Sequence, residues 1–119
     1  MVFLHIKNDK EELQANKARI RQLDNHIKNN KDAFILVYME GCGPCNMTRP
    51  EWIKLENALS NKYGKNNNVM IVDIDSEFIN KLKHLKHNIM SFPTLIYVSK
   101  SGKNIKNYED SNIKQKIEL

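Results

Sequence analysis

The stretch AFILVYMEGCGPC, residues 33–45, joins an apolar run to two closely spaced cysteines. Residues 33–39 are apolar or aromatic throughout, as in a strand that is buried on both faces at the centre of a parallel sheet. The glycines and proline that follow end the strand, and we expect a helix from there to about Tyr63. A buried strand that passes directly into a helix indicates an α/β architecture.

The remaining segments extend this pattern along the chain. We expect strands at residues 2–6, 69–74, 94–98 and 104–108. A long first helix is expected after Asn8, with Glu11 completing a capping box. A third helix is expected over residues 79–89, and a short fourth helix from about Ser111. The prediction is one three-layer α/β/α domain over residues 1–119, with a mixed, mostly buried sheet of about five strands and four helices.

Composition excludes several classes of protein. The chain has 119 residues, enough for a single hydrophobic core. No window approaches the roughly 18 apolar residues of a membrane span, and the first residues do not resemble a signal peptide. Lys and Asn, 16 of each, are typical of an AT-rich gene. We therefore expect a protein of the cytoplasm, or of the host cytoplasm or virion if the gene is viral.

The net charge of +5 does not by itself indicate a nucleic-acid-binding protein. Such proteins concentrate Arg and Lys on one stripe, often with aromatic residues between them. Here the lysines are scattered along the sequence, and only three arginines occur. We expect no nucleic-acid partner.

The two cysteines, Cys42 and Cys45, are placed for redox chemistry. Residues three apart face the same side of a helix, so the two sulfurs can reach each other. Cys42 precedes the helix, where free N–H groups and the positive end of the helix dipole stabilise a thiolate. Pro44 suits the first helical turn, and Gly43 lets another chain approach closely. Cys42 is the predicted attacking thiol and Cys45 the resolving thiol.

A zinc site is the main rival interpretation, because two cysteines at this spacing also form half of many zinc sites. His84 and His87 would have to complete it, yet 38 residues separate Cys45 from His84. A solvated helix face is the simpler interpretation of those histidines, and we predict no metal. His5 and His26 have no partner in sequence, so we interpret both as structural or surface residues.

The motif Cys42-Gly43-Pro44-Cys45, followed by Met47 and Pro50, resembles the thioredoxin family. Residues 89–94, IMSFPT, resemble the family's segment before the fourth strand, and a turn with Gly102 also fits. The resemblance covers almost the whole chain and implies a thioredoxin-like fold. It further implies a cis bond between Phe92 and Pro93 that faces the cysteines. Phe92, Pro93 and Thr94 would then bind an extended substrate strand, together with Gly43 and Pro44.

Three positions depart from the family pattern. Gly41 stands where the family has Trp, which removes an aromatic lip beside Cys42. Leu36 replaces the buried acid beneath the site, and Ile71 replaces its lysine partner. Without the acid, Cys45 would lie in a more apolar place and its pKa should rise. We therefore expect slower resolution of the mixed disulfide than in a typical thioredoxin.

The sequence thus predicts a thiol–disulfide oxidoreductase, foremost a thioredoxin-type reductant of protein disulfides. The reversible Cys42–Cys45 disulfide would be its only redox group, with no bound cofactor. By resemblance, an NADPH-dependent, thioredoxin-reductase-like donor would recharge it, and we expect a monomer. A disulfide isomerase or oxidase is an alternative, as is a thioredoxin-fold interaction module with incidental thiols.

Overall fold

The computed structural model describes residues 1–82 and 85–108. In chain order its strands and α-helices are β1 (Val2–Ile6), α1 (Leu13–Lys28), β2 (Asp32–Tyr38), α2 (Gly43–Tyr63), β3 (Val69–Asp75), β4 (Thr94–Ser99) and β5 (Asn104–Asn107). Each of the five strands agrees with its prediction to within one residue at either end. The thioredoxin-like α/β fold with a five-stranded mixed sheet is therefore confirmed.

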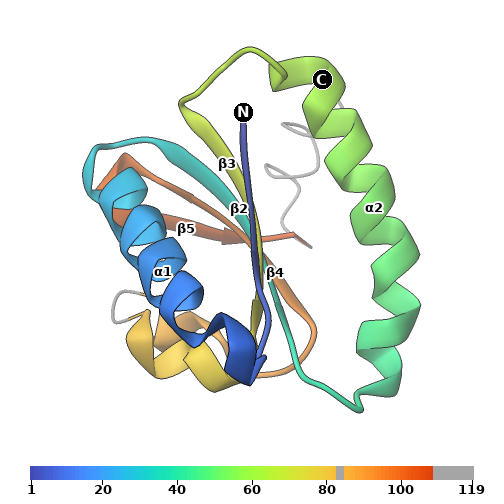
Figure 1. Cartoon of the computed structure of the whole chain (residues 1–119). Helices are drawn as coiled ribbons and strands as arrows, with labels where there is room; N and C mark the ends of the chain where they lie inside the picture. The colour runs from blue at the N-terminus through green and yellow to red at the C-terminus, as the bar shows by residue number, and fades with distance from the viewer. Residues whose placement is uncertain (83–84, 109–119) are drawn as a thin grey trace.

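The sheet has the strand order β1-β3-β2-β4-β5. β1, β3 and β2 run parallel, whereas β4 pairs antiparallel with both β2 and β5. β2 lies at the centre, which explains its apolar sequence, because both of its faces are covered. Cys42 and Cys45 follow the C-terminal end of β2, where the chain turns into α2 (Figure 1).

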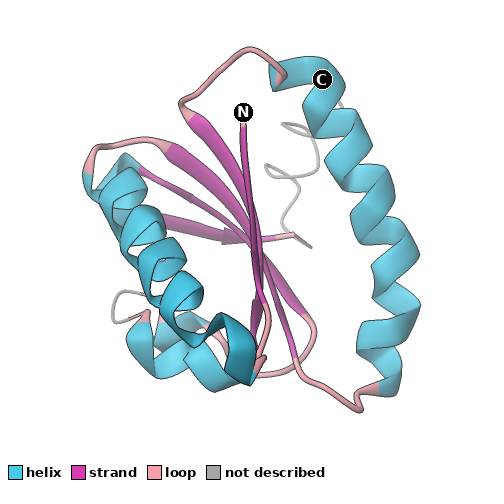
Figure 2. Cartoon of the chain, in the orientation of Figure 1, coloured by secondary structure: helices cyan, strands magenta, loops and turns pink. Residues whose placement is uncertain are grey.

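The two faces of the sheet are covered by different elements (Figure 2). Alternate residues of β2 point to opposite sides: Ala33, Ile35 and Val37 pack in the core cluster that also contains residues of α1. Phe34 and Leu36 pack in a second cluster with residues of α2. The residues that α1 contributes are Ile20, Leu23 and Ile27, and those from α2 are Trp52, Leu55 and Leu59.

The prediction of a third α-helix over residues 79–89 is wrong, because the described residues of this segment form a different kind of helix. The described part of this segment forms two 3₁₀ helices, η2 (Ser76–Lys81) and η3 (Lys86–Asn88). Leu82 and Leu85 pack in the core cluster that also contains residues of α1. The fourth helix, expected from Ser111, lies outside the described residues.

The start of the first helix also differs from the prediction by one residue. Asp9, and not Asn8, caps a short 3₁₀ turn, η1 (Lys10–Glu12), by accepting a hydrogen bond of 3.0 Å from the Glu11 backbone N–H. That turn continues into α1. Asp9 therefore takes the capping role that the sequence pattern assigned to its neighbour.

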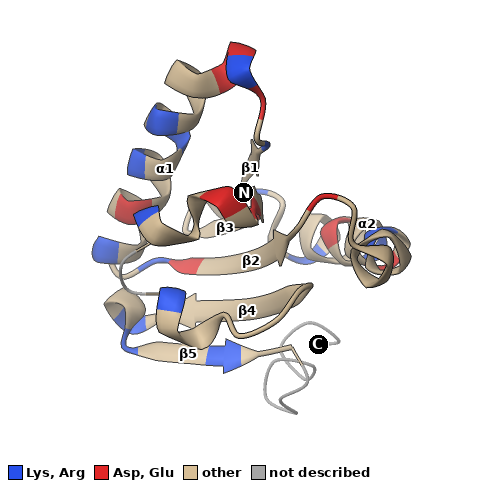
Figure 3. Cartoon of the chain, turned by 90° about the horizontal axis from the view of Figure 1, so that it is seen from below, with Lys and Arg blue, Asp and Glu red and all other residues tan. Residues whose placement is uncertain are grey.

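Charged residues are distributed over several elements. Figure 3 shows Lys and Arg on α1, on α2 and on β5, which lie on different sides of the molecule. Within the described residues, neither α-helix has both the length and the apolar character that crossing a membrane requires.

Candidate active site

Cys42 and Cys45 form a disulfide at the N-terminus of α2. Their Cα atoms are 5.2 Å apart, a separation that a disulfide spans without backbone movement. Cys42 is the N-cap residue and Cys45 lies in the first turn of the helix. The two residues are almost equally buried, at 9% and 8% exposed, so position in the helix distinguishes them better than exposure does.

The Cys42 sulfur accepts a hydrogen bond from the Cys45 backbone N–H, with a nitrogen–sulfur distance of 3.1 Å. This N–H belongs to the first turn of α2, where backbone donors have no carbonyl partner within the helix. After reduction, the same donor and the helix dipole would stabilise negative charge on Cys42. This hydrogen bond supports Cys42 as the thiol that attacks.

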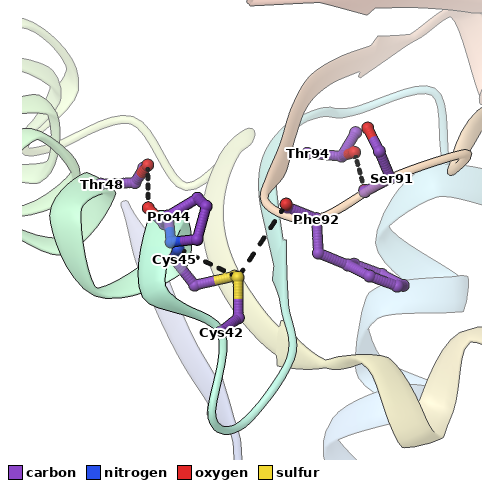
Figure 4. The surroundings of a disulfide bond; sticks show 7 residues. All are labelled: Cys42, Pro44, Cys45, Thr48, Ser91, Phe92 and Thr94. Carbon is purple, nitrogen blue, oxygen red and sulfur yellow. Dashed lines mark hydrogen bonds between the residues drawn. A yellow bond between two sulfur atoms is a disulfide. The ribbon is translucent and has the colours of Figure 1, made fainter.

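The loop before β4 approaches the disulfide from the other side (Figure 4). The Phe92 carbonyl oxygen lies 3.9 Å from the Cys42 sulfur, while its ring points away from the cysteines. The Phe92–Pro93 peptide bond is cis, the form that the resemblance implies. Thr94 follows, and its hydroxyl donates a hydrogen bond to the Ser91 carbonyl.

Two glycines leave open space around Cys42. A side chain at Gly41 would meet no atom within 4 Å, but its φ of +73° is one that other residues rarely adopt. Gly43 is equally open and has no positive φ. The absence of an aromatic lip therefore leaves an accessible rim at Gly41, in a backbone conformation that suits glycine.

By resemblance, Leu36 and Ile71 hold the positions of the family's buried acid and lysine. Leu36 and Ile71 are both buried and pack in the same cluster with Trp52. However, the register of β2 and β3 pairs Leu36 with Asp73, whose side chain is 14% exposed. The floor of the site is therefore less apolar than the sequence suggests.

A cavity of about 580 Å³ lies beneath the disulfide. Cys45 and Leu36 line it together with Asp73, Glu56 and His5. Burial, then the neighbouring Asp73, raises the pKa of Glu56. Burial, then the charges of Asp73 and Asp75, raises the pKa of Tyr38 in the cavity wall to about 12. Acidic side chains therefore lie close together in this cavity, which Lys7 and Arg49 also line.

The histidines have different outcomes. His26 is structural, as predicted: it is 7% exposed and its Nε2–H donates a hydrogen bond of 2.7 Å to the Asp32 carbonyl. Burial lowers the pKa of His26. His87 is exposed, and His84 lies outside the described residues. His5 does have a partner, because its Nδ1 pairs with the Asp73 carboxylate.

Sequence reasoning missed Asp73 and Glu56 as neighbours of the site. Asp73 is 68 residues from His5, and only the parallel pairing of β1 with β3 places them side by side. The alternation of β3 held a signal, because Asp73 follows Val69 and Ile71 on the face that α2 covers. An acid on an otherwise buried face indicates a polar partner on a neighbouring element, here His5 on β1.

Comparisons with known proteins agree with this geometry. The thioredoxin family model matches residues 3–119. Over 80 residues the chain is 35% identical to chicken (Gallus gallus) protein disulfide-isomerase, covering 66% of this chain and 14% of that protein. The chain therefore spans a small part of this curated relative.

Two solved structures show the same fold. The first thioredoxin domain of mouse protein disulfide-isomerase A4 superposes with a TM-score of 0.60 at 20% identity, covering 82% of this chain and 69% of that chain. Oxidised thioredoxin from Plasmodium falciparum superposes with a TM-score of 0.53 at 24% identity, covering 82% of this chain and 88% of that chain. Because the thioredoxin family model matches nearly the whole chain, the chain belongs to the thioredoxin family.

Proposed function

We propose that this protein is a thiol–disulfide oxidoreductase that reduces protein disulfides. The observation that carries the proposal is the Cys42–Cys45 disulfide, whose Cys42 sulfur accepts a backbone N–H and faces the Phe92 carbonyl. A structural crosslink across so short a loop would stabilise the fold little, because it restricts the unfolded chain only slightly. Redox exchange accounts for the pair better.

The reaction follows from the order of the two cysteines. The Cys42 thiolate attacks a substrate disulfide, forming a Cys42–substrate disulfide and releasing the other substrate sulfur as a thiolate, which takes up a proton. Cys45 then loses its proton and attacks the Cys42 sulfur. The Cys42–Cys45 disulfide forms and the second substrate sulfur leaves. Two electrons have passed from the protein to the substrate.

The surroundings of the disulfide suit an extended polypeptide as substrate. Open space at Gly43 admits a backbone at close range, and the groups around cis-Pro93 offer main-chain pairing. Met47 and Met90, 80% and 88% exposed, lie in the same two segments as these groups. Flexible, apolar methionines accommodate varied partners, which supports a reductant of many protein substrates.

The Gly-Pro pair between the cysteines favours the reducing direction by resemblance to thioredoxins. In that role the oxidised protein would receive electrons from an NADPH-dependent reductase, and the reducing cytoplasm would be its compartment. The similarity to chicken protein disulfide-isomerase supports isomerase or oxidase activity as a second candidate. Both candidates use the same two thiols and differ in their reduction potential.

Reduction of insulin disulfides, with dithiothreitol as the final electron donor, tests the proposal. We expect Cys42→Ser to lose all turnover and Cys45→Ser to accumulate mixed disulfides with the substrate. Asn46→Ser, an exposed neighbour in the same helical turn, is the matched control and should retain wild-type turnover. Full activity of Cys42→Ser would refute the proposal and favour an interaction module with incidental thiols.

A further inference from the structure

Three metal-binding side chains converge beside the β1 edge of the sheet. His5 comes from β1, Asp73 from β3 and Glu56 from α2, and one ligand atom of each lies within 4.8 Å of the others. We call these residues the His5 cluster. His5 and Asp73 are register partners on parallel strands, so the sheet itself fixes their relative position.

The cluster opens into the cavity of about 580 Å³ beneath the disulfide. All three side chains line it, with His5 on the exposed side and both carboxylates half-buried. The cavity therefore gives a small solute access to the three ligand atoms. Cys45 is in its wall, so anything bound there lies under the redox pair.

Charge in the cluster is unbalanced. The Glu56 and Asp73 carboxylates are both partly buried, and the repulsion between them contributes to the raised pKa of Glu56. In the described part of the chain, no Lys or Arg lies within ion-pair distance of either carboxylate, and their neighbour is the His5 imidazole. A divalent cation would neutralise both acids.

Trp52 supplies a second, independent indication. Its side chain is only 5% exposed and lines the same cavity, yet its indole N–H has no hydrogen-bond acceptor among the described residues. Glu56 lines the same cavity, and an interaction with Trp52 opposes the larger effects that raise the pKa of its carboxyl. A carboxylate that binds metal through one oxygen is commonly held by a donor to the other, and Trp52 is placed to be that donor.

We propose that His5, Glu56 and Asp73 bind one zinc ion. One imidazole nitrogen with two carboxylate oxygens is a zinc donor set that leaves a fourth position open. Magnesium and calcium prefer sites made of oxygen alone, so the imidazole favours zinc over them. The site uses neither cysteine and does not rest on the proposed redox function.

Zinc titration of the oxidised full-length chain, followed by calorimetry, tests this site. With the disulfide closed the protein has no free thiol, because it contains only two cysteines. We expect one zinc ion per chain, and at least about tenfold weaker binding in each of His5→Gln, Glu56→Gln and Asp73→Asn. Excess magnesium should not compete.

Matched controls separate this site from general surface binding. His87→Gln and Glu51→Gln remove an exposed imidazole and an exposed carboxylate, the latter also on α2, and should bind zinc as the wild type does. Wild-type protein that binds no zinc, or controls that weaken binding as much as the cluster variants, would overturn the proposal. If Asp73→Asn fails to fold, His5→Gln and Glu56→Gln decide it; the His5 side chain is 54% exposed, against 14% for Asp73.

Discussion

The two faces of the sheet differ in what their residues can do. Beneath α1 the core is large and aliphatic, and it includes Leu82 and Leu85 from the segment after β3. Beneath α2 the cluster is smaller, and two cavities adjoin it. The disulfide and the His5 cluster both lie on the α2 side. One face thus stabilises the fold, while the other leaves room for chemistry.

Truncating a leucine on each face tests this contrast with the largest expected effect. Leu23 in α1 is fully buried, and Leu23→Ala should lower the free energy of unfolding by about 3–5 kcal/mol. Leu55→Ala in α2 should cost less, about 2 kcal/mol, because Leu55 already borders a cavity. Urea unfolding of both variants measures the difference.

Leu23→Ala should also keep its insulin-reduction activity per folded molecule, since Leu23 packs in the α1-side core cluster, which includes neither Cys42 nor Cys45. Equal costs for the two truncations would contradict the division between the faces.

Leu36→Asp would place an acid on the α2 face at the floor of the site. We expect it to speed resolution of the mixed disulfide severalfold, because the carboxylate can accept the proton of Cys45. The cost should be about 2–3 kcal/mol of stability, since the position is buried and faces Asp73. Rapid-quench measurement of the mixed disulfide gives the rate.

Leu36→Asn is the control for polarity without an ionisable group. If the two variants resolve the mixed disulfide at the same rate, proton transfer does not limit this step.

The glycines at the rim offer a smaller, paired test. Gly41→Ala should destabilise the fold by about 1 kcal/mol, because its φ of +73° strains any side chain. Gly43→Ala should leave stability unchanged or slightly higher, because it has open space and helical surroundings. Thermal unfolding compares them, and an equal loss in both would show that positive φ is not the cause.

His26 gives the smallest effect, a pH-dependent contribution to stability on the α1 side. Its pKa is lowered in the folded protein from 6.5, so the unfolded chain binds more protons below that value. Stability should therefore fall as pH drops below about 6.5. In His26→Gln, which keeps a donor for the Asp32 carbonyl, this part of the pH dependence should vanish. His87→Gln should retain it in parallel urea titrations.

The strands could be predicted because their apolar patterns match burial on one or both faces. The Cys-Gly-Pro-Cys spacing predicted that the Cys42 and Cys45 sulfurs can meet, and the resemblance to thioredoxins predicted the cis bond before Pro93. The segment at 79–89 was mistaken for an α-helix because Ile79, Leu82 and Leu85 recur every three residues, which also fits 3₁₀ geometry. The His5 cluster could not be predicted, because it depends on the register of two strands and on how α2 lies across them.

The reduction potential of the Cys42–Cys45 pair tests the central claim most directly. Equilibration with glutathione buffers, with the two redox forms separated after thiol alkylation, would give the value. A protein disulfide reductant should have a potential near about −270 mV, as thioredoxin has. A value between about −120 and −180 mV would contradict the reductant and assign the same dithiol to oxidation or isomerisation.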